Sequence, residues 1–539
     1  VYGHYTCFIP TDSAFNVYFQ EKSITYDKLT SDEKKNIVFN HIIRGQSINY
    51  LTRNFSEGAL STANMNNRYI VISYMQNGDS TNVIMVNKSA RILTPDVELH
   101  NGVVHVIDHV MVPSEESVGN LLKTIPKFKI FGDALTMTHM TDSMLESYDM
   151  TYKSPYSTEY VNVLGYTMHT LQQKKLGYTI FAEPDSVFNA AGINNIQDLI
   201  AYAQKYYGSE DLQNYSSRNN PLNKFISYHL LNRQMSTNSF IYMGRNTSPS
   251  YTDKRYEYYE TLLQYRLMEI KAGNKINTQK DGTCVSLNEK ESNISATNGY
   301  IHCLNNIMVY DENIMRNDVL NKRIRFDAYS LAPELTNNNI RWHLSGNDSY
   351  TMPGNYCPGY FKFNDATKFI MWASQNWDDY QEDEMSLRGW YDFTVRMLPV
   401  PPGTYEIRLG YSPRAWGGLA QVFVDGKIIG IPVDFATDAD DPKIGWIKDS
   451  QTTDNGEEND KTMRNRGYMK APASVINFGY QTVMRDNRGC LRKILDTRTF
   501  QNYGPHYFRA KNVQSESGEF HFDYIEYCPV NLIDHEDKD

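Results

Sequence analysis

The sequence predicts a multidomain protein in which two α+β domains in tandem are followed by a mainly-β domain of the sandwich or jelly-roll type. Three observations predict this fold class. Three short motifs occur twice, in the same order, within the first 312 residues; all six tryptophans fall between residues 342 and 446; and strand patterns dominate from residue 318 onward. The length of 539 residues agrees with three or four domains of ordinary size.

The first repeated motif is a short strand that leads into a helix. It reads TCFIPTDSAF at residues 6–15 and TIFAEPDSVF at residues 179–188. We expect the Thr-x-Phe part to be a buried strand. The Thr or Asp that follows should cap the next helix, because its side-chain oxygen can accept from the first free N–H groups.

The second and third motifs each contain a histidine. The second reads NHII at residues 40–43 and YHLL at 228–231, and the third reads NGVVHVID at 101–108 and NGYIHCLN at 298–305. Asn-Gly predicts a turn with positive φ before a mostly apolar strand. The apolar neighbours of the four histidines favour hydrogen-bonded structural roles over a metal site; these residues are His41, His105, His229 and His302.

Together these motifs resemble the two signature motifs and the central Tyr-His of the fasciclin domain. The first copy matches well, although Asn40 stands where the family commonly has Tyr. The second copy departs at Glu183 and Pro184, which replace the proline and threonine of the family motif. The resemblance implies extracellular or cell-surface proteins that mediate adhesion or bind ligands, and it implies no catalysis.

The repeat also sets the predicted domain boundaries. We expect a first fasciclin-like domain at residues 1–113, a second with insertions at 114–314, and a Trp-rich β-sandwich at 318–539. Residues 115–176 supply the N-terminal helices of the family fold for the second copy, whereas the first copy lacks them. We therefore expect the first domain to be truncated at its N-terminus.

Strand signals are strongest in the third predicted domain. Residues 405–411 alternate Tyr, Ile, Leu and Tyr with mostly polar or small residues, which predicts a half-buried strand. Asp425-Gly426 between two apolar runs predicts a tight hairpin. The segments PGTYEI at 402–407 and FDYIE at 522–526 resemble those of galactose-binding-type sandwiches attached to bacterial surface proteins.

Exposed aromatic rings next to polar loops are the candidate ligand site. Trp372, Trp377 and Trp416 lie near polar, loop-like sequence, and Arg414 lies beside the last of them. Sugars present C–H surfaces that pack on such rings while polar side chains bind their hydroxyls. The alternative is that these tryptophans pack in the core, where large aromatic residues usually contribute.

Metal sites and disulfides receive weaker support. The acidic stretches 378–384 and 438–441 suggest a structural calcium, but neither has EF-hand spacing and most charge runs are solvated, so we expect no metal and no cofactor.

The cysteines lack CxxC spacing. Cys284 with Cys303, or two of Cys357, Cys490 and Cys528, are possible disulfide pairs, and buried free thiols are the alternative.

Several function classes are disfavoured. The net charge of −10 and pI near 5.8 argue against a nucleic-acid partner. The sequence contains no run of 18 apolar residues, so it predicts no transmembrane helix. The sequence has no HExxH helix, P-loop, dinucleotide fingerprint or Gly-x-Ser-x-Gly elbow, so we expect no enzyme. A pair of carboxylates for glycoside hydrolysis remains open, because such pairs are set by distance in space.

We therefore expect a non-enzymatic adhesion or ligand-binding protein of the cell surface, related to glycans, whose partner is an extracellular glycan or a surface protein. Chains with this organisation resemble surface lipoproteins of bacteria with two membranes, which implies an outer-membrane location and a lipid anchor on a removed N-terminus. One alternative is a structural accessory lipoprotein of an outer-membrane glycan-import complex. A second alternative is a glycoside hydrolase with fasciclin spacers.

Overall fold

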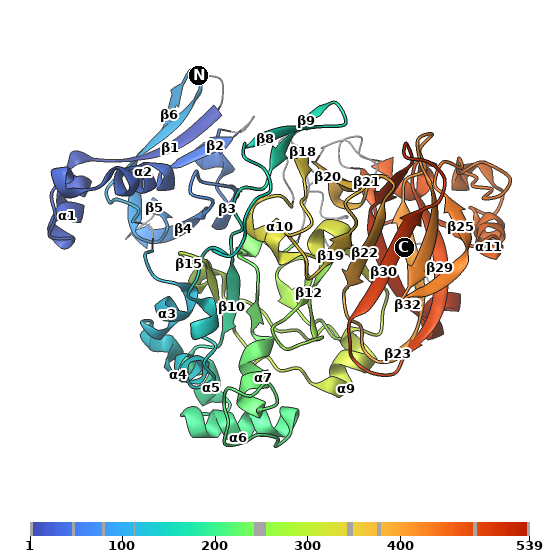
Figure 1. Cartoon of the computed structure of the whole chain (residues 1–539). Coiled ribbons are helices and arrows are strands. Elements are labelled where there is room, and N and C mark those ends of the chain that lie inside the picture. The colour runs from blue at the N-terminus through green and yellow to red at the C-terminus, as the bar shows by residue number, and fades with distance from the viewer. Residues whose placement is uncertain are drawn as a thin grey trace.

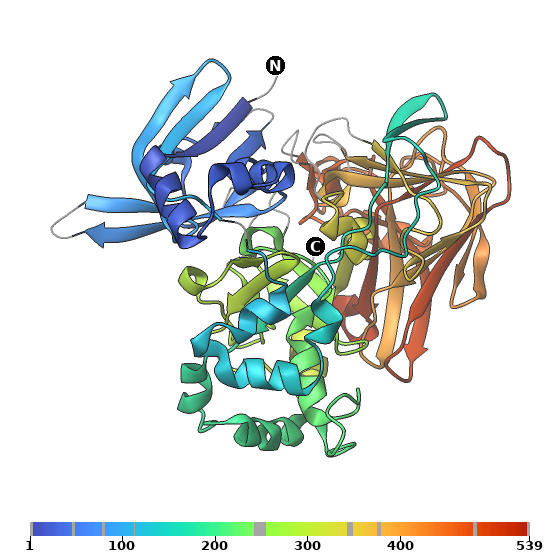
Figure 2. The ribbon, with the colours of Figure 1, turned by 60° about the vertical axis from the view of Figure 1, so that its left-hand side comes forward.

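The computed structural model describes residues 4–45, 49–77, 81–112, 114–241, 255–341, 349–373, 379–477 and 482–535. Three lobes are visible (Figure 1): a first lobe (residues 4–112, blue), a second lobe (mainly residues 114–314, teal to green) and a third lobe (mainly residues 318–535, yellow to red). Figure 2 shows the first and second lobes next to each other, with the third lobe to the right of both.

A seven-stranded sheet in the order β2-β1-β7-β6-β5-β4-β3 forms the first lobe. Its strands are β1 (His4–Pro10), β2 (Ile42–Gly45), β3 (Gly58–Ala63), β4 (Tyr69–Asn77), β5 (Thr81–Val86), β6 (Ala90–Leu99) and β7 (Gly102–Ile107), and its helices are α1 (Asp12–Glu21) and α2 (Ser31–Asn40). Thr11 caps α1 as predicted, because its hydroxyl accepts from the backbone N–H of Ala14 at 3.1 Å.

The second lobe repeats the central strand pairing of the first. Strand β10 (Tyr178–Ala182) pairs parallel with β16 (Gly299–Cys303) and antiparallel with β11 (Leu230–Leu231), as β1 does with β7 and β2. The remaining strands are β12 (Tyr256–Glu260), β13 (Leu267–Lys271), β14 (Lys275–Ile276) and β15 (Ile294–Ala296). The helices are α3 (Val118–Lys123), α4 (Lys129–Met137), α5 (Asp185–Ala190), α6 (Ile196–Tyr207) and α7 (Pro221–Tyr228).

The prediction that Asn-Gly turns need positive φ is wrong at both copies. Neither Gly102 nor Gly299 has a positive φ. A Cβ on Gly102 would lie 2.1 Å from the carbonyl oxygen of Tyr5, and one on Gly299 would lie 2.0 Å from that of Tyr178. Glycine is therefore required because the neighbouring parallel strand passes too close for any side chain.

Three larger sheets make up the third lobe, in the orders β17-β32-β23-β29-β26, β31-β21-β20-β18-β9-β8 and β19-β22-β30-β24-β25, beside a small β27-β28 ladder. Its first strands are β17 (Ile324–Asp327), β18 (Ser349–Thr351), β19 (Phe361–Phe363), β20 (Thr367–Ala373), β21 (Asp383–Gly389), β22 (Asp392–Met397), β23 (Gly403–Tyr411), β24 (Leu419–Val424) and β25 (Lys427–Asp434). They are followed by β26 (Tyr468–Lys470), β27 (Ile476–Asn477), β28 (Thr482–Val483), β29 (Leu491–Phe500), β30 (His506–Asn512), β31 (Glu519–Phe522) and β32 (Tyr524–Pro529). The short helices are α9 (Glu312–Ile314), α10 (Pro333–Asn337) and α11 (Glu457–Asn465).

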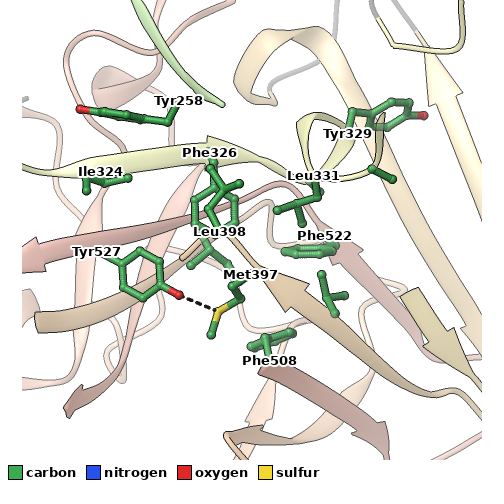
Figure 3. Packing of buried hydrophobic residues seen from close by; sticks show 14 of the residues in the cluster. Tyr258, Ile324, Phe326, Tyr329, Leu331, Met397, Leu398, Phe508, Phe522 and Tyr527 are labelled. Carbon is green, nitrogen blue, oxygen red and sulfur yellow. Dashed lines mark hydrogen bonds between the residues drawn. The ribbon is translucent and has the colours of Figure 1, made fainter. Parts of the chain in front are cut away.

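The second and third lobes share structure across the boundary that the sequence suggested. Strands β8 (Tyr160–Val163) and β9 (Tyr166–Thr170) come from the segment assigned to the second domain, yet β9 pairs with β18 of the third lobe. One hydrophobic core runs from Leu171 through Tyr258 to Tyr527. Figure 3 shows part of this core, where the hydroxyl of Tyr527 points at the sulfur of Met397. The domain boundaries themselves stay a prediction.

Strand β23 is buried on both faces, whereas its alternation predicted a half-buried strand. The face opposite Ile407 carries Glu406 and Arg408, whose side chains form an ion pair at 2.7 Å. Arg408 also contacts the buried Glu526 at 2.8 Å, and Arg325 contacts the same carboxylate at 2.9 Å. Paired charges can occupy a buried face that the sequence pattern assigns to solvent.

Three further expectations concern disulfides, the predicted hairpin and membrane spans. All six cysteines are free thiols, so the possible disulfide pairs do not form in this structure. The predicted hairpin is present between β24 and β25, with positive φ at both Asp425 and Gly426. In the part of the chain that the structure describes, no helix is long and apolar enough to cross a membrane.

Candidate functional site

The loop between β23 and β24 carries two of the predicted site residues, Arg414 and Trp416. The backbone of this loop is fixed against β31: the N–H of Gly418 donates to the carbonyl of Glu519 at 2.8 Å, and the N–H of Glu519 donates to the carbonyl of Trp416 at 3.3 Å. A Cβ on Gly417 would lie 2.4 Å from the backbone of Phe435, so this close passage needs glycine. The Trp416 side chain is 57% exposed on this fixed backbone.

Beneath the loop lies a buried cluster of Asp379, Glu384 and His521, which we call the His521 cluster. His521 lies on β31 and Glu384 on the neighbouring strand β21. The Nε2 atom of His521 contacts the Glu384 carboxylate directly, and its Nδ1 atom lies 3.7 Å from Oδ1 of Asp379. The hydroxyl of Ser412, at the start of the loop, donates to Asp379 at 3.0 Å.

The electrostatics of the cluster favour a charged histidine. Burial opposes the charge on His521, but the carboxylates of Glu384 and Asp379 outweigh burial and raise its pKa to about 9. Burial raises the pKa of Asp379 to about 6, against the opposing attractions of His521 and Arg414. Burial, together with the charges of Asp379 and Asp327, also raises the pKa of the adjacent Asp523. The cluster is therefore an ion-paired histidine that shares its protons with neighbouring acids.

The His521 cluster also has the geometry of a cation site. One ligand atom from each of its three side chains lies within 4.8 Å of the others. Asp379 Oδ2 and His521 Nδ1 have no hydrogen-bond partner in the part of the chain that the structure describes. A metal would need the neutral imidazole, so it would have to displace the protons that hold the ion pair.

The two acidic stretches of the sequence are used differently. Asp379 and Glu384 of the first stretch belong to the His521 cluster. In the second stretch, Asp440 pairs with Arg488 at 2.8 Å and Asp441 accepts from the N–H of Lys443 at 2.8 Å. The second stretch therefore forms one local turn and one surface ion pair with another loop.

The structure brings two of the four predicted site residues, Trp372 and Arg414, to this cluster. Trp372 lies directly opposite Glu384 in the β20–β21 ladder, so the two side chains share one face of the sheet. Its half-buried ring packs edge-on against Tyr166, with ring centroids 5.3 Å apart. Arg414 is close enough to act on the pKa of both Asp379 and His521. Trp377 lies outside the described residues.

Sequence reasoning missed two members of this site. His521 lies between the apolar Phe520 and Phe522 and carries no spacing signal to Glu384, which is far away in the chain. Ser412 lies in the polar sequence before Trp416 and carries no sequence signal for its contact with Asp379. The acidic stretch that includes Asp379 and Glu384 was the only sequence signal for the cluster.

The repeated histidines are hydrogen-bonded in the core, as predicted. The Nδ1 atoms of His41 and His229 each lie 2.7 Å from the carbonyl of the residue four positions earlier. The Nε2 atoms of His105 and His302 lie 2.8 and 2.9 Å from the carbonyls of Tyr50 and Met235. These matched contacts explain the repeated histidines without a metal ion.

Comparison with known proteins supports the fasciclin part of the sequence interpretation. Residues 2–113 match the family model of the fasciclin domain. No curated protein matches the chain. Among solved structures, the FAS1 domain pair of the insect cell adhesion molecule fasciclin I has a TM-score of 0.24 and 16% identity, over 58% of this chain and 90% of that chain.

Two other solved structures are similar over smaller parts of the chain. The Paenibacillus xanthan lyase has a TM-score of 0.18 and 13% identity, over 30% of this chain and 12% of that chain. A family 35 carbohydrate binding module from Clostridium thermocellum has a TM-score of 0.15 and 11% identity, over 34% of this chain and 88% of that chain. The family match covers the first lobe, residues 2–113, while the assignments of the second and third lobes stay predictions.

Proposed function

We propose that the chain is a non-enzymatic adhesion or ligand-binding protein of the bacterial surface, and that its third lobe binds glycans at the loop of Arg414 and Trp416. The fasciclin domain at residues 2–113 supports the adhesion part of this proposal. The glycan ligand, the outer-membrane location and the lipid anchor all belong to the proposal.

The observation that carries the proposal is the exposure of Trp416. Large aromatic side chains are usually mostly buried, and an indole that is 57% exposed on a fixed loop is costly unless something covers it. A pyranose ring can cover an indole through its C–H face. Arg414, which begins the same turn, supplies hydrogen-bond donors for sugar hydroxyls or carboxylates.

The test is a glycan panel on the full chain, with Trp416→Ala as the site variant. We expect the variant to bind its glycan at least about tenfold more weakly, which corresponds to about 1.4 kcal/mol. Trp390→Ala is the matched control, because Trp390 is also exposed, at 48%, and lies in a different loop, after β21. An equal loss in both variants, or no binding to any glycan at millimolar concentration, would overturn the proposal.

A second candidate function, the accessory subunit of an import complex, is favoured by strand β25. This strand ends its sheet, and Ile428 and Ile431 on it are 64% and 85% exposed. An edge strand with exposed apolar residues can pair with a partner protein. If this function is correct, Ile431→Lys abolishes co-purification with an outer-membrane partner and leaves glycan binding intact.

The hydrolase alternative depends on two carboxylates that reach one substrate. Asp379 and Glu384 are close together, but both are buried around His521. An ion pair of this kind serves structure or proton sharing without needing access for a sugar. This arrangement supports the non-enzymatic proposal, and an assay for release of reducing sugars from the bound glycan would test it.

A further inference from the structure

A cleft of about 640 Å³ lies where the three lobes meet. The first lobe contributes the turn at residues 65–69 and part of α2, the second contributes residues 147–148, 175–176 and Gln234, and the third contributes residues 336–341. Pockets of this size commonly bind small ligands. The cleft lies apart from the loop of Trp416, which contributes none of its lining residues.

Two of the cations in this cleft are half-buried and have no acidic partner in the described part of the chain. Arg68 and Lys175 form no salt bridge with any carboxylate among the residues that the structure describes. Among the described residues, the Arg68 guanidinium makes one hydrogen bond, a long one at 3.4 Å to the carbonyl of Ser114. Burial lowers the pKa of both groups, and the charge of Arg68 lowers the pKa of Lys175 further. The cleft thus holds two like charges that burial and mutual repulsion both disfavour.

The acids that line the cleft are engaged elsewhere. Glu33 accepts from the backbone N–H of Thr30 at 2.7 Å in the capping box of α2. The largely exposed Glu115 lies 3.6 Å from Lys22. The remaining buried cation of the cleft, Arg341, is paired with a carboxylate of its own, Glu257, at 3.1 Å. The charge left over in the cleft is therefore positive, in a protein whose net charge is −10.

Contacts between lobes hold the two cations in place. The N–H of Tyr69, next to Arg68, donates to the hydroxyl of Tyr300 in the second lobe at 3.0 Å. The N–H of Lys175 donates to the side chain of Asn338 in the third lobe at 3.0 Å. The backbone segments that carry the two cations are thus positioned by contacts between the assembled lobes.

We propose that this cleft binds a saccharide through an acidic group, a carboxylate or a sulfate, with Arg68 and Lys175 as the counter-charges. Charge-assisted hydrogen bonds from these two side chains hold the anion. The amides of Asn66, Gln234 and Asn339 meet sugar hydroxyls, and the Tyr148 ring, 39% exposed, offers an apolar face. For its ligand class the inference rests on the proposed glycan function, but it uses a separate site.

The test is calorimetric titration of the full chain with glucuronic acid, galactose 6-sulfate and neutral galactose. We expect the acidic sugars to bind at least about tenfold more tightly than galactose, and the stronger of the two identifies carboxylate or sulfate as the preferred group. Arg68→Gln and Lys175→Gln should each weaken that binding about tenfold or more, because each removes a charge-assisted hydrogen bond to the anion. Arg53→Gln and Lys123→Gln, at exposed cations outside the cleft, are matched controls and should change nothing.

The outcomes separate this inference from the function proposed for Trp416. Equal affinity for acidic and neutral sugars, or unchanged binding in the Arg68 and Lys175 variants, overturns the cleft site whatever the Trp416→Ala result. Loss of panel binding in Trp416→Ala with retained binding of the acidic sugar supports two independent sites. Thermal melting checks the fold, and Lys175→Gln should not lower Tm, because it removes a charge that Arg68 repels.

Discussion

The first and second lobes place the same histidine in the same position and complete its hydrogen bonds with different chemistry. In the first lobe, Nε2 of His41 accepts directly from the backbone N–H of Met111 at 2.9 Å. In the second lobe, Glu183 stands between the equivalent groups: its Oε1 atom lies 2.9 Å from Nε2 of His229 and accepts from the N–H of Met308 at 2.9 Å.

This difference explains the departure of the second copy from the fasciclin motif. Glu183 occupies the position that Pro10 holds in the first copy. The carboxylate extends the hydrogen-bond path from the histidine to the backbone, so the His229 ring and the Met308 N–H both keep a partner through Oε1, while Oε2 of Glu183 has none among the described residues. Both ring nitrogens of His229 face an acceptor, whereas Nε2 of His41 faces a donor. A departure from a motif can therefore mark a compensated site and leave the fold intact.

The largest expected effect is that of removing the acid. Glu183→Ala leaves His229 and the Met308 amide without their partner inside the core, and should lower the free energy of unfolding by about 3–5 kcal/mol. Pro10→Ala is the matched change in the first lobe and should cost less than about 1 kcal/mol. Urea denaturation measures both, and equal losses would show that the two lobes do not differ in this way.

Acid pH should weaken the second lobe through His302. Burial lowers the pKa of this histidine to about 4, below its ordinary value of 6.5. The unfolded chain therefore takes up the proton first, so stability is complete above pH 6.5 and is lost as the pH falls toward 4, by up to about 3 kcal/mol. Urea midpoints measured from pH 7 to 4 should fall less in a folded His302→Gln variant, and parallel curves would contradict this assignment.

Alkaline pH should destabilise the third lobe through His521. The pKa of His521 is raised to about 9, so its ion pairs stabilise the fold fully below pH 6.5 and are lost as the pH rises through 9. The loss should reach about 3 kcal/mol at most, for a shift of this size. The same denaturation series, continued from pH 7 to 10, should be flatter for His521→Gln. A series with no fall in this range would rule out a charged His521.

A smaller difference in stability is expected between the two strand-to-helix connections, at the N-caps of α1 and α5. Thr11 caps α1 with its side chain, whereas Pro184, at the equivalent position, makes no such bond to α5. Thr11→Ala should therefore cost about 1 kcal/mol and Pro184→Ala less. Helix α5 starts instead with Asp185, whose carboxylate accepts from the N–H of Ile130 at 3.0 Å. If urea midpoints show equal losses of stability in the two variants, the Thr11 side chain contributes no capping energy beyond that of Pro184.

The smallest effect belongs to the loop of the candidate glycan site. Trp416→Ala should change the free energy of unfolding by no more than about 0.5 kcal/mol, because the side chain is 57% exposed. Its binding loss would then reflect the ligand site alone. A shift of several degrees in Tm would instead mean that the indole supports the fold.

Much of the first lobe could be predicted from the sequence because its signals are local. The Thr11 cap and the hydrogen bond from His41 to the carbonyl of Ile37 each join residues that are near one another in the chain. The hairpin at Asp425-Gly426 is a signal of the same local kind in the third lobe. The glycines of the Asn-Gly motifs were correctly singled out, but the reason was wrong, since it lies in the carbonyl of another strand. Even a correct local signal can have a non-local cause.

The sequence by itself determined the order of the motifs, the fasciclin domain at its start and the strand-rich character of its last part. Tertiary structure alone decided which charges meet: Asp379 and Glu384 surround His521, and Arg68 lies in the same cleft as Lys175. The physical reason is that patterning and capping act over a few residues, whereas ion pairs and clefts depend on distances in space between groups more than 100 residues apart.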